Sequence, residues 1–180
     1  MSPAVALGGS RGGAATASLT EVDGRRVAWF ALGGGKHRGA IGPVEGDVIE
    51  RAVRMALELG VPIVGELATS GADVYEGLPS LHAWGKTAAA LSEASGAVPI
   101  VFSVVGPCVS GPALLLGLAD HVVMTSEAFA YVCGPATVAE FTGVSMTRSD
   151  LGGASVHDRL SGVASLLVTD QEDARAAVED

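Results

Sequence analysis

Blocks of apolar residues alternate with blocks of helical periodicity along the first two thirds of the chain. Short apolar runs over 25–32, 62–67 and 98–105 predict buried strands. Between them, apolar residues recur at helical spacing and predict helices over 44–59 and 79–95. Strands that alternate with helices form β-α-β units, so we expect an α/β fold with a mainly parallel sheet.

Several elements have end signals in the sequence. Glu45 lies in the first turn of the helix over 44–59, where the helix dipole favours an anion, and Gly60 is placed to end it as a C-terminal cap. Thr169 and Glu172 have capping-box spacing and predict the start of a last helix. Gly106-Pro107 is expected to end the strand before it.

The second half of the chain has shorter blocks with the same alternation. They predict a short helix over 111–118, strands over 121–125 and 128–132, helices over 135–142 and 149–159, and a final strand over 161–168.

The N-terminal residues differ in composition from the rest. Residues 1–18 are rich in Gly, Ala and Ser, so we expect a flexible tail. Residues 19–180 are expected to form a single domain, because no internal repeat or linker divides them. A hydrophobic content of 48% allows a sizeable core, which only 4% aromatic residues make largely aliphatic.

Charge and composition exclude several classes of protein. A net charge of −9 argues against nucleic acid as a partner. No apolar run approaches the ~20 residues of a membrane span, and no signal peptide is visible. Cys108 and Cys133 form no C-x-x-C pair, so we expect no metal site and two buried free thiols. These features predict a soluble, cytoplasmic protein without a membrane partner.

Two of the predicted strands end in Gly-rich loops. ATSGADVYEG follows the strand over 62–67, and GPCVSGPALLL follows the strand over 98–105. In α/β sheets, ligands bind beyond the carboxyl ends of the strands. Small residues there expose backbone amides, and the helix predicted from Gly111 adds a positive dipole end. The sequence therefore predicts a site where two amides can hold one developing oxyanion.

The two loops are similar to the oxyanion loops of the crotonase superfamily. Over about 42–168, the chain resembles the carboxyltransferase (beta subunit, or its N-terminal half) of biotin-dependent acyl-CoA carboxylases. The segments that carry this resemblance are EGLPSLHAWGK, GPCVSG, YVCGPATVAEFTG and DLGGASVHDRLSGVA. The resemblance implies a crotonase (ClpP/crotonase-like) fold with repeated β-β-α units and a mainly parallel sheet.

The same resemblance implies the residues of the site. The amides of Ala72 and Gly111 would bind the thioester oxygen, with Ser110 beside them as a third catalytic position. Substrate-binding positions would be Ser70, Gly71, Gly106, Gly134 and Pro135.

In this family, an acyl-CoA becomes an enolate that accepts a carboxyl group from biotin. The resemblance implies acyl-CoA as substrate, a biotin carboxyl carrier protein, and a second carboxyltransferase subunit of the C-terminal type, hence a hetero-oligomer. Hydratases of the superfamily place glutamates where this chain has Leu114 and Ala136, so hydratase activity is not expected.

Two residues depart from the family pattern. Asp73 stands where the family usually has an arginine, and Ser110 where it usually has a glycine. The first change removes a cation near the expected CoA path. The second narrows the approach of a ligand to the second loop. Two alternatives therefore stay open, which are a decarboxylase subunit acting on a malonyl-type thioester and a catalytically silent assembly partner.

Other reactive side chains have plainer interpretations. The basic cluster of Lys36, His37 and Arg38 predicts a solvated loop, with CoA phosphate binding as the alternative. His157 is expected to cap or pack rather than to bind a ligand. Cys108 is expected to be a packed thiol, because no base can be identified for it.

Overall fold

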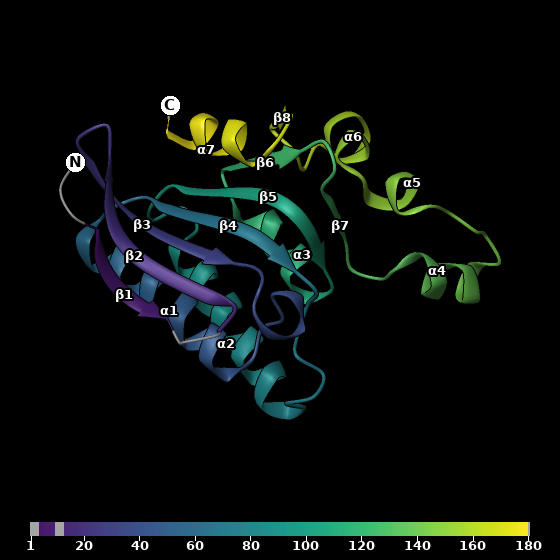
Figure 1. Cartoon of the computed structure of the whole chain (residues 1–180), viewed down its shortest axis with the longest axis horizontal. Coiled ribbons are helices and arrows are strands. Elements are labelled where there is room, and N and C mark those ends of the chain that lie inside the picture. The colour runs from purple at the N-terminus through teal and green to yellow at the C-terminus, as the bar shows by residue number, and fades with distance from the viewer. Residues whose placement is uncertain (1–3, 10–12, 180) are drawn as a thin grey trace.

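The structure is a computed structural model that describes residues 4–9 and 13–179. Among these residues, strands form one sheet in the order β1-β2-β3-β4-β5-β6-β8, and β7 pairs with β5 (Figure 1). β1, β2 and β3 are antiparallel, and every pairing from β3 onward is parallel. The strands are β1 (Val5–Gly9), β2 (Ala15–Val22), β3 (Arg25–Leu32), β4 (Ile63–Thr69), β5 (Ile100–Val109), β6 (His121–Thr125), β7 (Phe129–Tyr131) and β8 (Leu166–Val168).

Helices connect the parallel strands. The longer ones are α1 (Pro43–Leu59), α2 (Leu78–Ala94), α4 (Pro135–Thr142) and α7 (Gln171–Glu179). The short turns are η1 (Lys36–Arg38), α3 (Gly111–Leu115), η2 (Leu116–Leu118), α5 (Arg148–Gly152), α6 (Ala154–Val156) and η3 (His157–Ser161). The mainly parallel sheet predicted from the alternation of blocks is confirmed.

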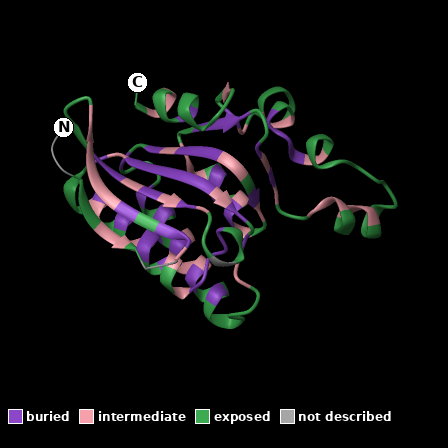
Figure 2. Cartoon of the chain, viewed as in Figure 1, coloured by how far each residue is buried: buried purple, intermediate pink, exposed green. Residues whose placement is uncertain are grey.

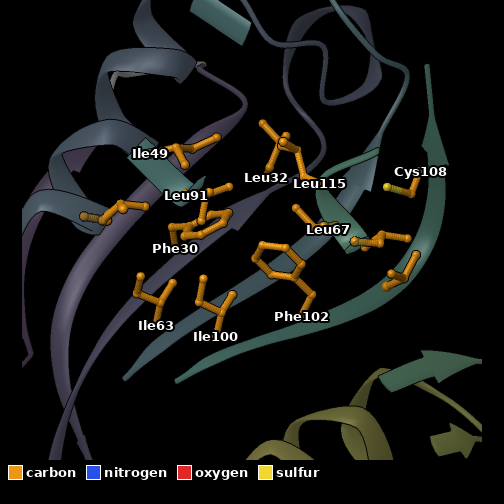
Figure 3. Packing of buried hydrophobic residues seen from close by; sticks show 14 of the residues in the cluster. Phe30, Leu32, Ile49, Ile63, Leu67, Leu91, Ile100, Phe102, Cys108 and Leu115 are labelled. Carbon is orange, nitrogen blue, oxygen red and sulfur yellow. The ribbon is translucent and has the colours of Figure 1, made fainter. Parts of the chain in front are cut away.

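The main core lies between the sheet and the helices α1 and α2. The rings of Phe30 on β3 and Phe102 on β5 pack edge to face, with their centroids 6.1 Å apart. Ile49 of α1 and Leu91 of α2 belong to the same core cluster (Figure 3). The two rings flank Gly65 of β4, where an added Cβ would stand 2.5 Å from Phe30 and 2.7 Å from Phe102. Glycine at this position therefore lets the two aromatic rings approach each other.

A buried carboxylate lies on the opposite face of the sheet. Side chains alternate along a strand, so Glu66 points away from its neighbour Gly65 and from the main core. Gln171 Nε2 donates to Glu66 Oε1 at 2.8 Å, and Arg175 Nε donates to Oε2 at 3.0 Å. Glu66 is 7% exposed, and its hydrogen bond raises the pKa of the Arg175 guanidinium. These contacts fix α7 on the second face of the sheet.

The prediction of an N-terminal tail is wrong for most of its described residues. Residues 5–9 form β1, and β2 begins at Ala15, so the boundary between 1–18 and 19–180 divides a strand. Ala15 and Ala17 are buried beside α1, and β2 pairs along its whole length with β3. Small side chains are typical of a flexible tail, but here they suit a strand packed closely against a helix. Residues 1–3 and 10–12 of the expected tail lie outside the described residues.

The predicted helix over 44–59 and its cap at Gly60 are confirmed. Gly106-Pro107 does not end β5, because Pro107 pairs with Phe129 of β7 and Cys108 pairs with Thr69 of β4. Pairing on both flanks keeps this part of the strand extended.

The C-terminal elements differ in their ends. β8 begins at Leu166 rather than at 161, because 157–161 form a helical turn. The cap of α7 is Asp170 rather than Thr169, since Asp170 Oδ1 accepts from the amides of Glu172 (2.9 Å) and Asp173 (3.0 Å).

An arm projects from the body of the molecule between β7 and α5 (Figure 1). We define the arm as residues 132–147, and it contains α4. No residue of α4 is buried (Figure 2). Apolar side chains of the arm are exposed, among them Phe141 at 84%, Val144 at 55% and Val132 at 50%. No helix in the described ranges has both the length and the apolar composition to cross a membrane.

Candidate functional site: two strand-end loops

The two Gly-rich loops lie against each other. β4 and β5 are parallel neighbours, so their carboxyl ends meet at one edge of the sheet. Thr69 at the end of β4 pairs with Cys108, and a Cβ added to Gly71 would stand 3.0 Å from the Cβ of Ser110. Gly71 has φ +104°, a conformation that glycine adopts without strain. The structure thus brings together the loops that the sequence singled out.

The amide of Ala72 has a defined direction. Ile41 N donates to Gly71 O at 2.8 Å, and Asp73 N donates to Ile41 O at 2.9 Å. Successive peptide groups of an extended segment point to opposite sides, so the N–H of Ala72 faces away from Ile41. β5 and its loop lie on that other flank. In the described part of the chain, this N–H has no acceptor.

The amide of Gly111 is the first of α3. Ser110, the residue before it, has φ +64° and donates its own N–H to Tyr131 O at 2.9 Å. The N–H of Gly111 has no acceptor among the described residues. The next residue, Pro112, has no backbone N–H. A Cβ added to Gly111 would overlap the indole of Trp84 on α2, so this close packing requires glycine. No sequence pattern predicts the contact of Trp84 with Gly111, because the two residues belong to different elements.

The expected substrate-binding positions fall into two groups. Ser70 and Gly71 belong to the first loop, and an added Cβ at Gly106 would stand 3.2 Å from the Cβ of Ala68. Gly134 and Pro135 instead begin α4 at the base of the arm.

A hydrogen-bonded pair that the sequence did not predict lies beside the first loop. His37 Nδ1 and Asp73 Oδ2 are 2.7 Å apart, and the His37 ring lies 4.6 Å from the ring of Tyr75. The hydrogen bond to His37 holds the pKa of Asp73 below its usual range. The sequence places His37 only in a basic cluster, because 36 residues separate it from Asp73. The side chain of Lys36 lies outside the described atoms.

A hollow of about 350 Å³ lies on the second face of the sheet, next to Glu66 and Gln171. Ala68 and Val105 line it, and these residues stand at the bases of the two loops. The hollow therefore reaches the strand ends from the side that α7 covers.

The cysteines differ in environment. Cys108 is fully buried, and burial raises the pKa of its thiol to about 12, which suppresses the reactive thiolate. Cys133 is exposed in the arm, so the prediction of two buried thiols is wrong for it. The arm lies outside the core of the sheet, so Cys133 and its apolar neighbour Val132 are both exposed.

His157 packs as expected from the sequence. Its Nε2 lies 2.8 Å from Ala130 O, and its Nδ1 lies 2.8 Å from Ser161 Oγ. Both ring nitrogens are therefore engaged within the chain. Over the described residues, no three His, Cys, Asp or Glu side chains are grouped so as to hold a metal ion.

The sheet order and the two touching strand-end loops define a crotonase-type α/β protein. Residues 11–180 match the family model described as "Carboxyl transferase domain", and the chain belongs to this family. The resemblance inferred from the loop motifs is thus confirmed at the level of family and fold.

Three known proteins show the extent of the similarity. The propionyl-CoA carboxylase beta chain of Saccharopolyspora erythraea is 32% identical over 160 residues, which cover 88% of this chain and 29% of that protein. A transcarboxylase 12S structure has a TM-score of 0.87 at 27% identity, covering 92% of this chain and 32% of that one. A Pseudomonas malonate decarboxylase hetero-dimer has a TM-score of 0.85 at 25% identity, covering 99% of this chain and 78% of that one. The chain spans about a third of the length of the curated relatives it matches.

Proposed function

We propose that this chain is the acyl-CoA-binding part of a biotin-dependent carboxyltransferase and stabilises the enolate of its substrate. The observation that carries the proposal is that the amides of Ala72 and Gly111, on two loops in contact, have no acceptor among the residues that the structure describes. Donors fixed in place before reaction stabilise developing negative charge without reorganising. Of the proposed substrate-binding positions, Ser70 and Gly71 lie on the first loop and Gly106 lies in β5. Gly134 and Pro135 lie at the base of the arm.

The chain's task in this reaction is electrostatic. Loss of the α-proton places negative charge on the thioester oxygen, and two amides that donate to this oxygen lower the energy of that state. Biotin on a carrier protein would supply the carboxyl group and take up the proton when bound. The donor set fits this division, because backbone amides hold an oxyanion without moving a proton themselves.

We also propose that the chain works in a hetero-oligomer with a second, C-terminal-type carboxyltransferase subunit and a biotin carboxyl carrier protein. The exposed apolar side chains of the arm support a contact surface, since such side chains commonly mark interaction sites. The free thiols of Cys108 and Cys133 support a reducing compartment such as the cytoplasm.

A decarboxylase subunit is the second candidate. The similarity to the malonate decarboxylase hetero-dimer favours it, because this chain covers 78% of a chain of that structure. Decarboxylation of a malonyl-type thioester passes through the same enolate, so the same two amides would serve.

Removal of one amide tests the proposal. The protein, purified with whatever co-purifies, is assayed with biotin plus acyl-CoA and with malonyl-CoA. Ala72→Pro removes a donor that no group in the described chain uses, and Ala72→Gly retains it as the matched control. We expect Ala72→Pro to lower turnover ~10²–10³-fold, the loss typical of one oxyanion donor. Release of CO2 from malonyl-CoA without biotin would establish the decarboxylase instead, and wild-type protein without turnover or CoA binding would leave an assembly role.

A further inference from the structure

We propose that His37 and Asp73 are a positioning pair that sets the direction of the Ala72 amide. The inference rests on the proposed function, in which this amide receives the oxygen of an acyl thioester.

The backbone on either side of Ala72 is fixed by one neighbouring segment. Ile41 O accepts from Asp73 N, and Ile41 N donates to Gly71 O. Within the described part of the chain, no such bond reaches Ala72 itself. The direction of the Ala72 N–H therefore depends on where Ile41 and the residues before it lie. A shift of residues 37–41 would turn the peptide groups on both sides of Ala72.

The segment that holds the loop is itself in an unusual conformation. His37 and Arg38 both have φ +55°, in the left-handed region that L residues rarely adopt. Such a conformation persists only where surrounding contacts over-determine it. Two contacts to the first loop hold the backbone here, since Ser70 N donates to Arg38 O at 3.1 Å and Ser70 Oγ donates to His37 O at 2.5 Å.

The bond from His37 to Asp73 adds a side-chain link between this segment and the residue directly after Ala72. Asp73 uses both carboxylate oxygens, because Oδ1 accepts from Tyr75 N at 3.0 Å while Oδ2 binds His37 at 2.7 Å. Its side chain is 14% exposed, whereas that of His37 is 43% exposed and rests on the Tyr75 ring. Because Asp73 directly follows Ala72, its bond to His37 links residues 37–41 to the backbone beside the Ala72 amide.

The charge at position 73 indicates whether this residue binds the substrate or holds the loop. A cation at this position would attract an anionic ligand, whereas both carboxylate oxygens of Asp73 are engaged by hydrogen bonds within the chain. This chain therefore uses the position to hold the loop rather than to bind substrate charge. Asp73→Arg should accordingly release the loop and not improve thioester affinity.

The test uses the full chain, with Asp73→Asn and His37→Ala as single and double variants. Asp47→Asn is the matched control, because it removes the same charge from an exposed pair with Lys86 (2.8 Å) away from the loops. In ¹⁵N-labelled protein, we expect the Ala72 amide signal to move and its hydrogen exchange to change in all three variants, but not in the control. Unchanged Ala72 signals in folded variants would overturn the proposal.

Kinetics of the protein with its co-purified partner gives the second measurement. We expect kcat to fall about 10–100-fold with a much smaller change in KM, since a misplaced donor weakens the transition state more than the ground state. The double variant should lose no more than the worse single variant, because the two side chains act as one unit. Losses that multiply would refute the pairing. If the wild type turns over no thioester, the proposed function fails, while the amide measurement still decides the pair.

Discussion

Because Glu66 is buried and Arg175 is exposed, removing either partner of this ion pair should lower the free energy of unfolding by different amounts. Arg175→Met leaves the Glu66 carboxylate under α7 with Gln171 as its remaining partner. The side chain of Glu66 is 10% exposed, while that of Arg175 is 55% exposed, so solvent screens part of the attraction. A hydrogen bond to a charged group contributes about 1.5–3 kcal/mol, and we take the lower part of that range for this variant. Glu66→Leu instead leaves Arg175 and Gln171, whose exposed side chains water can solvate, so its cost should stay below ~1 kcal/mol.

The assay is equilibrium unfolding in urea at neutral pH, followed by circular dichroism. The free energy of unfolding should fall more for Arg175→Met than for Glu66→Leu, at an unchanged dependence on urea. The double variant should recover part of the loss, because no buried charge is left without a partner. A Glu66→Leu variant that costs as much as Arg175→Met, or a double variant whose losses add, would refute the reasoning.

Three further predictions concern other parts of the molecule. Gly65→Ala should lower stability by about 1–3 kcal/mol, measured by thermal unfolding, because the new Cβ would meet Phe30 at 2.5 Å; an unchanged melting temperature would contradict this packing. Asp73 has a lowered pKa in the folded chain, so its bond with His37 stabilises the fold above the ordinary aspartate pKa and is lost as pH falls through the lowered value. Unfolding followed from pH 6 to 2 should therefore show a stability difference between wild type and Asp73→Asn that shrinks in acid, and a constant difference would argue against the pair. Phe141→Ser should leave the melting temperature of the isolated chain unchanged, since the ring is 84% exposed, but should weaken co-purification of the proposed partner subunit. Equal recovery of that subunit would exclude Phe141 from the contact.

Periodicity and loop composition predicted the elements whose side chains divide clearly into buried and exposed. The strand over 25–32 and the helix over 44–59 have this division, and both were confirmed. β2 lacks it, because Ala15 and Ala17 are small and its outward residues are polar. Its place in the sheet comes from pairing with β3, a tertiary contact that composition does not report.

The candidate site was predictable as far as its loops. Gly71 and Gly111 belong to Gly-rich runs after apolar strands, and parallel strands bring such runs together. The bond of His37 to Asp73 and the contact of Trp84 with Gly111 join residues far apart in sequence, so only the folded chain reveals them.

Helix α2 has a consequence for how the two amides keep their separation. It begins directly after the first loop, and its Trp84 fills the space beside Gly111 in the second. The position of α2 therefore determines the distance between the amides of Ala72 and Gly111. A displacement of α2, for example by a larger residue at Gly46, where an added Cβ would stand 2.8 Å from the Ala83 Cβ, should reach both loops at once. Attempts to widen the site for a bulkier thioester will have to redesign this helix together with the loops.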